Sequence, residues 1–192
     1  MTREERILEI MAGSDKGWAA YYNMIPELIR ERGYKQGIEV GVFAGGHAES
    51  ILNNSSLNLL VGIDPYRMLP AQNLLKNQED YDCLYDFVLN RLNSNRYTHL
   101  RMTSDQAYLK LILNKEMFDF VFIDGMHIYS QIRRDLNNYE TLIRKGGIIA
   151  CHDYHHSSYP RLTKAIDEFS KQYNTKIVIG PFHAIYMEKT WE

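Results

Sequence analysis

The feature that most constrains the fold of this chain is a regular alternation between short apolar runs and segments of helical periodicity. Five runs lie at residues 37–42, 57–64, 97–102, 118–124 and 146–153, and most are apolar on successive positions. A strand that is covered by helices on both faces needs apolar side chains on both faces, so these runs are typical of a parallel sheet. We therefore expect an α/β fold with helices on both sides of the sheet.

The last part of the chain departs from this alternation. Residues 176–189 hold two strand-like runs that are separated only by Gly180 and Pro181. Parallel neighbours need a long crossover, so these two runs must pair antiparallel. The expected architecture is a Rossmann-like three-layer α/β sandwich with a seven-stranded, mostly parallel sheet that ends in an antiparallel hairpin. This ending disfavours a nicotinamide-binding domain, because such domains normally continue with parallel units.

Helical periodicity marks several of the remaining segments. Residues 4–12 and the apolar positions of residues 18–29 predict two N-terminal helices, and Pro26 indicates that the second helix kinks or restarts. The apolar positions of residues 132–143 predict an amphipathic helix, with Gly146 at its C-terminal cap.

A further helix is expected at residues 81–92, which are apolar on more than one helical face. Such a helix must cover something besides its own sheet. A substrate lid or a contact between subunits of a homo-oligomer would both satisfy it, and the sequence does not separate them.

Length and charge exclude several classes of protein. The chain has 192 residues, no internal repeat and no Pro/Gly/Ser-rich linker, so we expect one domain. Residues 1–35 would form an N-terminal helical lid or cap, and residues 36–189 the α/β core. The formal net charge is −2 and no basic run is long enough to follow a phosphate backbone, which argues against nucleic acid as a partner.

The sequence contains no sign of secretion or of a metal-binding cysteine motif. Residues 1–17 carry charges where a signal peptide needs an apolar core, and no stretch is apolar over about 18 residues, the length of a membrane helix. We expect a soluble, cytoplasmic protein with no membrane partner. Cys83 and Cys151 lie far apart, so neither a disulfide framework nor a zinc knuckle is indicated.

A glycine-rich turn follows the first expected strand in "EVGVFAGGHAES". Gly41 and Gly45 let the backbone turn tightly into a helix and leave bare amide groups for a ligand. Phe43 stands where a dinucleotide fingerprint has its second glycine, so a pyrophosphate would be obstructed. Asp64 ends the next strand about 20 residues later, where a carboxylate can accept both hydroxyls of a ribose. Together the two motifs favour a nucleoside ligand.

From about residue 39 to residue 187, the chain resembles class I S-adenosylmethionine-dependent methyltransferases. The resemblance rests on the Glu39-x-Gly41-x-x-x-Gly45 pattern, on Asp64 and on the terminal hairpin. It implies that Glu39 orients the amino group of the cofactor, that the two glycines pass close to its methionine part, and that Asp64 holds its ribose. The implied cofactor-binding residues are Glu39, Gly41, Gly45, Asp64, Ser104 and Asp105, of which the last two would contact adenine.

Two carboxylates end the fourth and fifth expected strands, Asp124 and Asp153. If these strands are neighbours, the two side chains lie roughly 5 Å apart beside the cofactor pocket. They would repel each other unless one were protonated or a cation lay between them. Magnesium accepts one or two carboxylates and keeps positions for water or substrate. His127, three residues after Asp124, is suited to take a proton from a hydroxyl group on that ion.

The Asp124-x-x-His127 spacing and Asp153 are similar to the pattern of metal-dependent small-molecule O-methyltransferases that act on sugar hydroxyls. Residues 14–17 resemble the N-terminal lid of that family more faintly. The resemblance implies that Asp124, His152 and Asp153 hold the metal and that His127 and Asp124 take part in catalysis. Several relatives have a second acid where this chain has His152, a softer ligand that would either shift the preference from magnesium toward manganese or iron or mean weak metal binding. The implied reaction is methylation of a sugar, polyol or glycosylated metabolite.

Other interpretations of the same residues stay open. Asp124 and Asp153 could cap the helices that follow them, and His155 and His156 are most simply loop residues. A metal-dependent hydrolase or oxygenase could use these two histidines together with His152 and Asp153. A non-catalytic protein could keep the nucleoside pocket alone.

Overall fold

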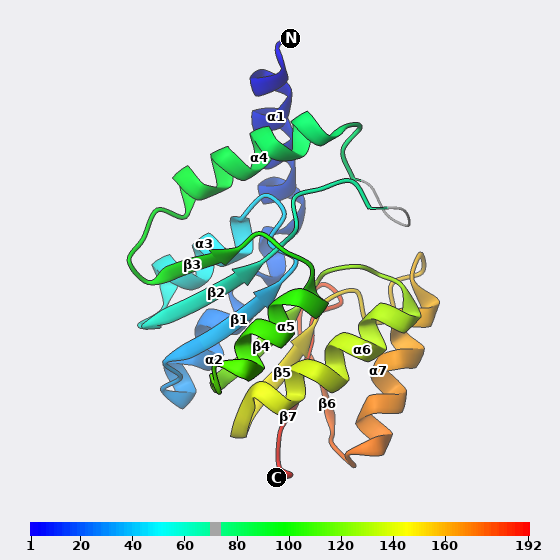
Figure 1. Ribbon diagram of the computed structural model, residues 1–192. Helices are drawn as coiled ribbons and strands as arrows, with labels where there is room; N and C mark the ends of the chain where they lie inside the picture. The colour runs from blue at the N-terminus through cyan, green and yellow to red at the C-terminus, as the bar shows by residue number, and fades with distance from the viewer. Residues whose placement is uncertain (70–73) are drawn as a thin grey trace.

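The computed structural model describes residues 1–69 and 74–192, and residues 70–73 lie outside the described part. The sheet has the strand order β3-β2-β1-β4-β5-β7-β6 (Figure 1). Its strands are β1 (Gln36–Val40), β2 (Leu59–Ile63), β3 (Tyr97–Leu100), β4 (Phe118–Ile123), β5 (Ile143–Cys151), β6 (Ile177–Ile179) and β7 (Ile185–Glu188). The first five strands pair in parallel, whereas β7 pairs antiparallel with both β5 and β6. The predicted seven-stranded sheet with its terminal hairpin is therefore confirmed.

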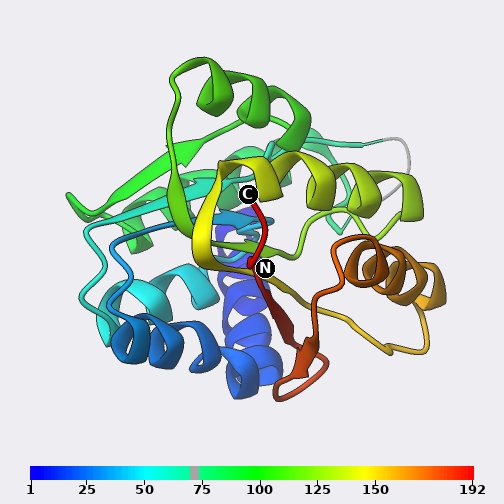
Figure 2. The same cartoon turned by 90° about the horizontal axis from the view of Figure 1, so that it is seen from below.

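Helices cover both faces of the sheet. They are α1 (Arg3–Trp18), α2 (Met24–Arg32), α3 (Gly46–Asn54), α4 (Gln78–Arg91), α5 (Ser104–Leu113), α6 (Tyr129–Tyr139) and α7 (Pro160–Gln172), with short 3-10 turns η1 (Ala19–Tyr21) and η2 (Glu140–Leu142). One buried cluster joins α1 to α4 to one face, and a second joins α5 to α7 to the other. Figure 2 shows α2 and α3 on one side of the sheet and α6 on the other. Within the described residues, no helix has the length and apolarity needed to cross a membrane.

The boundary between α6 and β5 differs from the prediction. The helix ends at Tyr139, and Ile143 is already the first residue of β5, where it pairs with Phe118. Gly146 is not a helix cap but lies inside the strand with φ +83°, at an irregularity in the pairing with β4. Its N–H donates to the carbonyl of Lys189. The helical spacing was misleading because pairing with β4 extends the strand backwards over residues that also suit a helix.

The first N-terminal helix, α1, is longer than its apolar pattern indicates, whereas α2 begins only at Met24. The α1 helix begins with a capping box, in which the side chains of Thr2 and Glu5 each accept the other's backbone N–H. The chain restarts as α2 with Pro26 in its first turn, so the predicted restart is confirmed. These helices share the hydrophobic cluster of one sheet face, which includes Ile7 and Phe122.

The additional apolar face of α4 packs on α1. Leu84 and Val88 of α4 are fully buried in the same cluster as residues of α1. Arg3 and Arg6 of α1 both pair with Asp80, a carboxylate that is almost completely buried in the first turn of α4. The N-terminal helix is thus one neighbour that this face covers, and Tyr81 of α4 also lines the cavity described below, while a contact between subunits stays a prediction.

Candidate active site

A cavity of about 380 Å3 opens at the carboxyl ends of the central strands. Ligands of open α/β sheets bind at this edge, where the strand order reverses; here β1 lies between β2 and β4. The cavity is lined by every residue that was predicted to bind the cofactor, to hold the metal or to take part in catalysis: Glu39, Gly41, Gly45, Asp64, Ser104, Asp105, Asp124, His127, His152 and Asp153. The fold therefore brings the two predicted groups of residues into one space.

Glycine is required in the turn after β1. Gly41 has φ +91°, and a Cβ atom there would lie 2.2 Å from the carbonyl oxygen of Asp124. The end of β4 therefore passes so close to this turn that no side chain fits. Gly45 is the N-cap of α3 with φ +77°, a conformation that L side chains rarely adopt. Gly41 thus brings this turn directly against the end of β4, which carries Asp124, whereas Gly45 lies against Val88 of α4.

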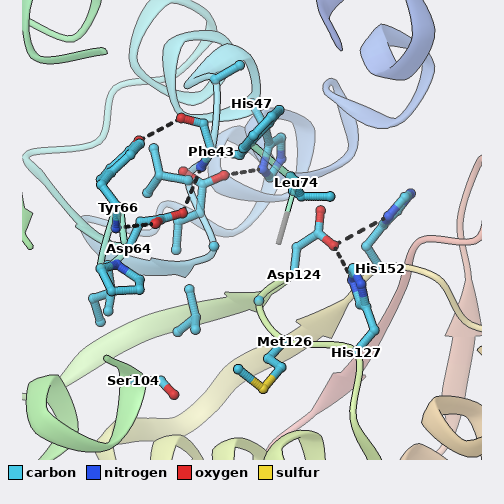
Figure 3. A pocket seen from close by; sticks show the side chains of 18 of the residues that line it. Phe43, His47, Asp64, Tyr66, Leu74, Ser104, Asp124, Met126, His127 and His152 are labelled. Carbon is cyan, nitrogen blue, oxygen red and sulfur yellow. Dashed lines mark hydrogen bonds and ion pairs between the residues drawn. The ribbon is translucent and has the colours of Figure 1, made fainter. Parts of the chain in front are cut away.

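Asp64 is held at the cavity wall by backbone groups. Its carboxylate accepts the N–H of Phe43 at 3.0 Å and the N–H of Tyr66 at 2.9 Å. The hydroxyl of Tyr66 donates back to the carbonyl of Phe43, so the two loops are tied together (Figure 3). Burial raises the pKa of Asp64, and these backbone donors oppose the rise. Each carboxylate oxygen has two acceptor positions, so the side chain can still accept from a ligand.

A buried pair that the sequence did not reveal lies behind the glycine turn. Oε1 of Glu39 lies 2.8 Å from Nδ1 of His47, and both side chains are almost completely buried. Their other polar atoms, Oε2 of Glu39 and Nε2 of His47, are buried without a hydrogen-bond partner among the described residues. Buried polar atoms in native proteins nearly always have partners, so these two are suited to a polar ligand. The only signal was a histidine two residues after Gly45.

The residues predicted to contact adenine lie together on one wall. Ser104 and Asp105 form the first turn of α5, after the N-cap Thr103. Nε2 of Gln131 on α6 donates to Oγ of Ser104 at 3.1 Å, which fixes the direction of that hydroxyl. Figure 3 places Ser104 near Met126, on the opposite side of the cavity from His47. Gln131 and Met126 also line the cavity and were not predicted.

The acidic cluster forms as expected at the ends of two neighbouring strands. Asp124 follows β4, His152 and Asp153 follow β5, and these strands pair directly. One ligand atom from each of the three side chains lies within 4.8 Å of the others, so the group could hold a metal ion. Asp153 has φ +60°, an uncommon backbone conformation for a residue other than glycine.

His127 lies between the two carboxylates. Its Nε2 is 3.3 Å from Oδ1 of Asp124 and 3.0 Å from Oδ2 of Asp153. Nδ1 of His152 lies 3.6 Å from Asp124 and 3.5 Å from Asp153 (Figure 3). From the sequence, the repulsion between the two carboxylates was expected to be removed by protonation of one of them or by a cation between them. In the structure, two imidazole rings that can carry positive charge also lie beside both carboxylates.

The pKa values follow from this arrangement. Burial alone would lower the pKa of His127, but hydrogen bonds to Asp124 and Asp153 and their charges raise it to about 9. The same opposing causes raise the pKa of His152 to about 10. Burial raises the pKa of both carboxyl groups, and the two histidines more than offset it, so both pKa values end below the usual range. At neutral pH the cluster therefore holds two carboxylates and two imidazolium groups.

Several residues near the cluster escaped the sequence analysis. Tyr21 reaches it from η1, and its hydroxyl donates to Oδ2 of Asp124 at 3.2 Å. The ring of Tyr159 lies 4.4 Å from that of His127. His156, interpreted as a loop residue, lines the cavity, whereas the ring of His155 packs 4.1 Å from that of Tyr154. The contacts of Tyr21 and Tyr159 join segments that are distant in sequence, so only the folded chain shows them. The fold also decides that His156 faces the cavity while the neighbouring His155 does not.

Comparisons with known proteins identify a family for more than half of this chain. The sequence profile of a methyltransferase domain matches residues 38–154. An uncharacterised protein of Acanthamoeba polyphaga mimivirus is 29% identical over 120 residues, which make up 61% of this chain and 50% of that protein. The chain thus spans about half the length of the curated relative that it matches.

Solved structures share the fold at low sequence identity. An O-methyltransferase from Bacillus cereus in complex with SAH has a TM-score of 0.66 and 16% identity, over 96% of this chain and 89% of that one. The TDP-rhamnose 3'-O-methyltransferase of calicheamicin biosynthesis has a TM-score of 0.64 and 13% identity, over 97% of this chain and 92% of that one. At these identities the likeness establishes the fold, and the chemistry must be argued from the site.

Proposed function

Because this chain belongs to the methyltransferase-domain family, we propose that it transfers the methyl group of S-adenosylmethionine to a hydroxyl group of a small molecule. One observation carries the proposal. A single cavity joins carboxylates suited to a nucleoside with a cluster of acids and histidines. Because both halves open into the same space, an attacking oxygen and a methyl carbon can be held in line, and such positioning supplies much of the rate of a transfer between two bound reactants.

The residues of the nucleoside half fit the cofactor. Oε2 of Glu39 is a buried acceptor with no hydrogen-bond partner in the described part of the chain, which suits the ammonium group of the methionine part. Nε2 of His47 likewise has no partner among the residues that the structure describes, so it is available to a polar group of the same part of the cofactor. Asp64 would accept the ribose hydroxyls, and Ser104 and Asp105 would meet the adenine. The two glycines, Gly41 and Gly45, leave room for the chain of the cofactor between these groups.

The residues of the reaction half fit a divalent cation. Asp124 and Asp153 supply carboxylate oxygens and His152 an imidazole nitrogen, a donor set that magnesium or manganese accepts. A cation bound there would lower the pKa of a hydroxyl group that it contacts. Asp124, His152 and Asp153 would hold it, and the hydroxyl group of the acceptor would lie on the side of His127.

His127 is the side chain placed to take the proton of that hydroxyl group. It can do so only in its neutral form, and the carboxylates of Asp124 and Asp153 are what keep it protonated at neutral pH. Neutralising these carboxylates with other positive charge removes the cause of the raised pKa. The base role of His127 therefore depends on an occupied cation site, which links the two parts of the proposal.

A sugar, polyol or glycosylated metabolite is the proposed acceptor. The cavity carries many hydrogen-bonding side chains on its reaction side, among them His127, His156 and Tyr159, which suits a polyhydroxylated molecule. We further propose that residues 1–35 are a cap of the same domain as residues 36–189, because they share one hydrophobic cluster. A homo-oligomer stays a prediction.

A hydrolase or oxygenase built on His152, Asp153, His155 and His156 is less well supported. His155 does not line the cavity, and its ring packs on Tyr154 instead. Such an enzyme would also have no use for the buried pair of Glu39 and His47. The methyl-transfer proposal accounts for both halves of the cavity.

The proposal is tested by calorimetric titration with S-adenosylhomocysteine, with and without magnesium. Wild type should bind it, and Asp64→Ala should bind it roughly 10–100-fold more weakly, because a charged acceptor is lost. Asp86→Ala, an exposed carboxylate on α4, is the control and should match wild type. Equal affinity of wild type and Asp64→Ala would contradict the cofactor assignment. A wild type that binds but methylates no sugar or polyol in mass spectrometry would be a nucleoside-binding protein instead.

A further inference from the structure

Tyr21 belongs to the N-terminal segment, outside the residues 38–154 that match the family profile. It is nevertheless a wall of the reaction half of the cavity. Only 3% of its surface is exposed, and its hydroxyl donates to Oδ2 of Asp124 at 3.2 Å. The N-terminal segment therefore contributes a polar contact to the acidic cluster.

The ring of Tyr21 is enclosed by other rings. It stacks on Phe122 with ring centroids 5.9 Å apart and planes 14° apart, and it lies 4.1 Å from the ring of His152. His47 of the nucleoside half lies 5.4 Å away on another side. This packing leaves the hydroxyl with a defined direction, toward Asp124.

The contacts of Asp124 divide between its two oxygens. Oδ2 accepts the hydroxyl of Tyr21, while Oδ1 faces Nε2 of His127 at 3.3 Å and Nδ1 of His152 at 3.6 Å. A cation held by the cluster would therefore meet Oδ1. The hydroxyl of Tyr21 keeps the carboxylate from rotating or binding through both oxygens.

The segment that carries Tyr21 is anchored beside the glycine turn. The guanidinium of Arg91 on α4 pairs with Asp15 of α1 at 3.0 Å and with Glu49 of α3 at 2.5 Å. It also donates to the carbonyl of Ala44 in the turn itself. Because α1 is tied to the cofactor turn in this way, the position of Tyr21 is fixed relative to both halves of the cavity.

We propose that Tyr21 is a positioning residue for the cation site, whose hydroxyl orients Asp124 so that one oxygen alone is presented to a divalent cation. This inference rests on the metal-assisted part of the proposed function. Outer hydrogen-bond partners of metal ligands typically account for roughly 10–100-fold in metal affinity. Removing the hydroxyl while keeping the ring should therefore weaken cation binding without emptying the cavity wall.

The experiment is a titration of the full chain with Mn²⁺, followed by electron paramagnetic resonance of the free ion, in the absence of cofactor. Tyr21→Phe should bind Mn²⁺ roughly tenfold more weakly than wild type. Tyr34→Phe is the matched control, since Tyr34 is also buried and its hydroxyl donates to one acceptor, the carbonyl of Gly146 at 2.9 Å, while it accepts from Arg32 at 3.5 Å. That variant should bind Mn²⁺ like wild type. The affinity of Tyr21→Phe for S-adenosylhomocysteine without metal should stay within about twofold of wild type, because the ring remains.

Equal Mn²⁺ affinity in wild type and Tyr21→Phe would overturn the inference and leave the methyl-transfer proposal standing. An equal loss in Tyr34→Phe would overturn it too, because the effect would then be one of general stability. An unfolded Tyr21→Phe in circular dichroism would show that the hydroxyl holds the fold instead. A wild type that binds no Mn²⁺ would remove the cation site itself, whereas failure to bind S-adenosylhomocysteine would remove the cofactor assignment.

Discussion

The two halves of the cavity both depend on carboxylates but hold them in different ways. In the nucleoside half, Asp64 is fixed by backbone N–H groups, and burial raises the pKa values of both Asp64 and Glu39. In the reaction half, Asp124 and Asp153 are paired with two histidines that lower their pKa values despite burial. Asp64 is thus held by the backbone, and Asp124 and Asp153 are held by opposite charges, whereas Glu39 of the nucleoside half also has a histidine partner, His47. Changes of shape at the glycine turn should therefore damage the nucleoside half, and a change of charge should damage the half that carries the charge.

The largest expected effect is on shape. Gly41→Ala would place a Cβ atom 2.2 Å from the carbonyl of Asp124 at φ +91°, so the end of β4 must move. We expect a loss of about 3 kcal/mol or more in the free energy of unfolding, together with loss of S-adenosylhomocysteine binding. Gly13→Ala is the control, because nothing lies within 4 Å of its added Cβ in α1, and it should be neutral or slightly stabilising. Urea denaturation measures both, and a Gly41→Ala as stable as wild type would show that the two halves do not constrain each other.

Two charge substitutions, one in each half of the cavity, test whether the halves act independently when each variant is titrated with both ligands. Glu39→Gln should weaken S-adenosylhomocysteine binding roughly 10–100-fold, because a charge-assisted hydrogen bond is lost, and leave Mn²⁺ binding unchanged. Asp153→Asn should do the opposite, since it removes a metal ligand and the partner of His127. Calorimetry and Mn²⁺ titration give the two affinities for each variant. If either substitution weakened both ligands equally, the two halves would be one electrostatic unit.

A third kind of buried carboxylate, Asp135, provides a pH test next to the adenine wall, because Gln131 donates to both Asp135 and Ser104. Burial raises the pKa of Asp135 on α6 from 3.8 to about 6, and its Oδ2 has no hydrogen-bond partner among the described residues. The folded chain therefore binds more protons than the unfolded chain between these two values. The stabilising contribution of Asp135 is complete below pH 3.8 and is lost as the pH rises through about 6.

Asp135→Asn removes that titration. At pH 8 its melting temperature should exceed that of wild type by a few degrees, and the difference should shrink or reverse near pH 4. Thermal unfolding followed by circular dichroism across this range measures it. A constant difference at all pH values would show that packing of the amide, and not the charge, is responsible.

The smallest expected effect is at the adenine end. Oγ of Ser104 already accepts from Gln131, and its hydroxyl also hydrogen-bonds the carboxyl group of Asp135, so a ligand would gain at most one further neutral hydrogen bond there. Ser104→Ala should weaken S-adenosylhomocysteine binding by about threefold, far less than Glu39→Gln. Calorimetric titration would separate the two. A loss as large as that of Glu39→Gln would mean that recognition is concentrated at the adenine and not at the methionine end.

Most of the fold and the main residues of the site could be predicted because their signals are local. Asp64, Asp124 and Asp153 each follow an apolar run, and the carboxyl ends of parallel strands meet at one edge of a sheet. The end of α6 was misplaced at Gly146 because β5 competes for the residues from Ile143 onward, and local periodicity does not contain that competition.

The site residues that were not predicted from the sequence make contacts between different elements of the fold. His47 meets Glu39 only because α3 folds back along β1, and Tyr21 meets Asp124 only because the N-terminal helices lie over that face of the sheet. From the sequence, several partners could have covered the apolar face of α4, and only the structure shows that α1 packs against it. A sequence pattern states what kind of neighbour a residue needs, but not which neighbour it receives.

The sequence alone determined the order of the strands along the chain, the antiparallel ending and the chemistry available at each strand tip, because side-chain periodicity and chain length act over a few residues. Only the tertiary structure decided that Asp124 and Asp153 share two histidine partners, that Glu39 has a partner in His47 and that Tyr21 touches the reaction half. These contacts depend on packing and charge over a few ångströms, and they join residues that are up to 103 positions apart in the sequence. Such contacts exist only once the sheet has brought its strand ends together.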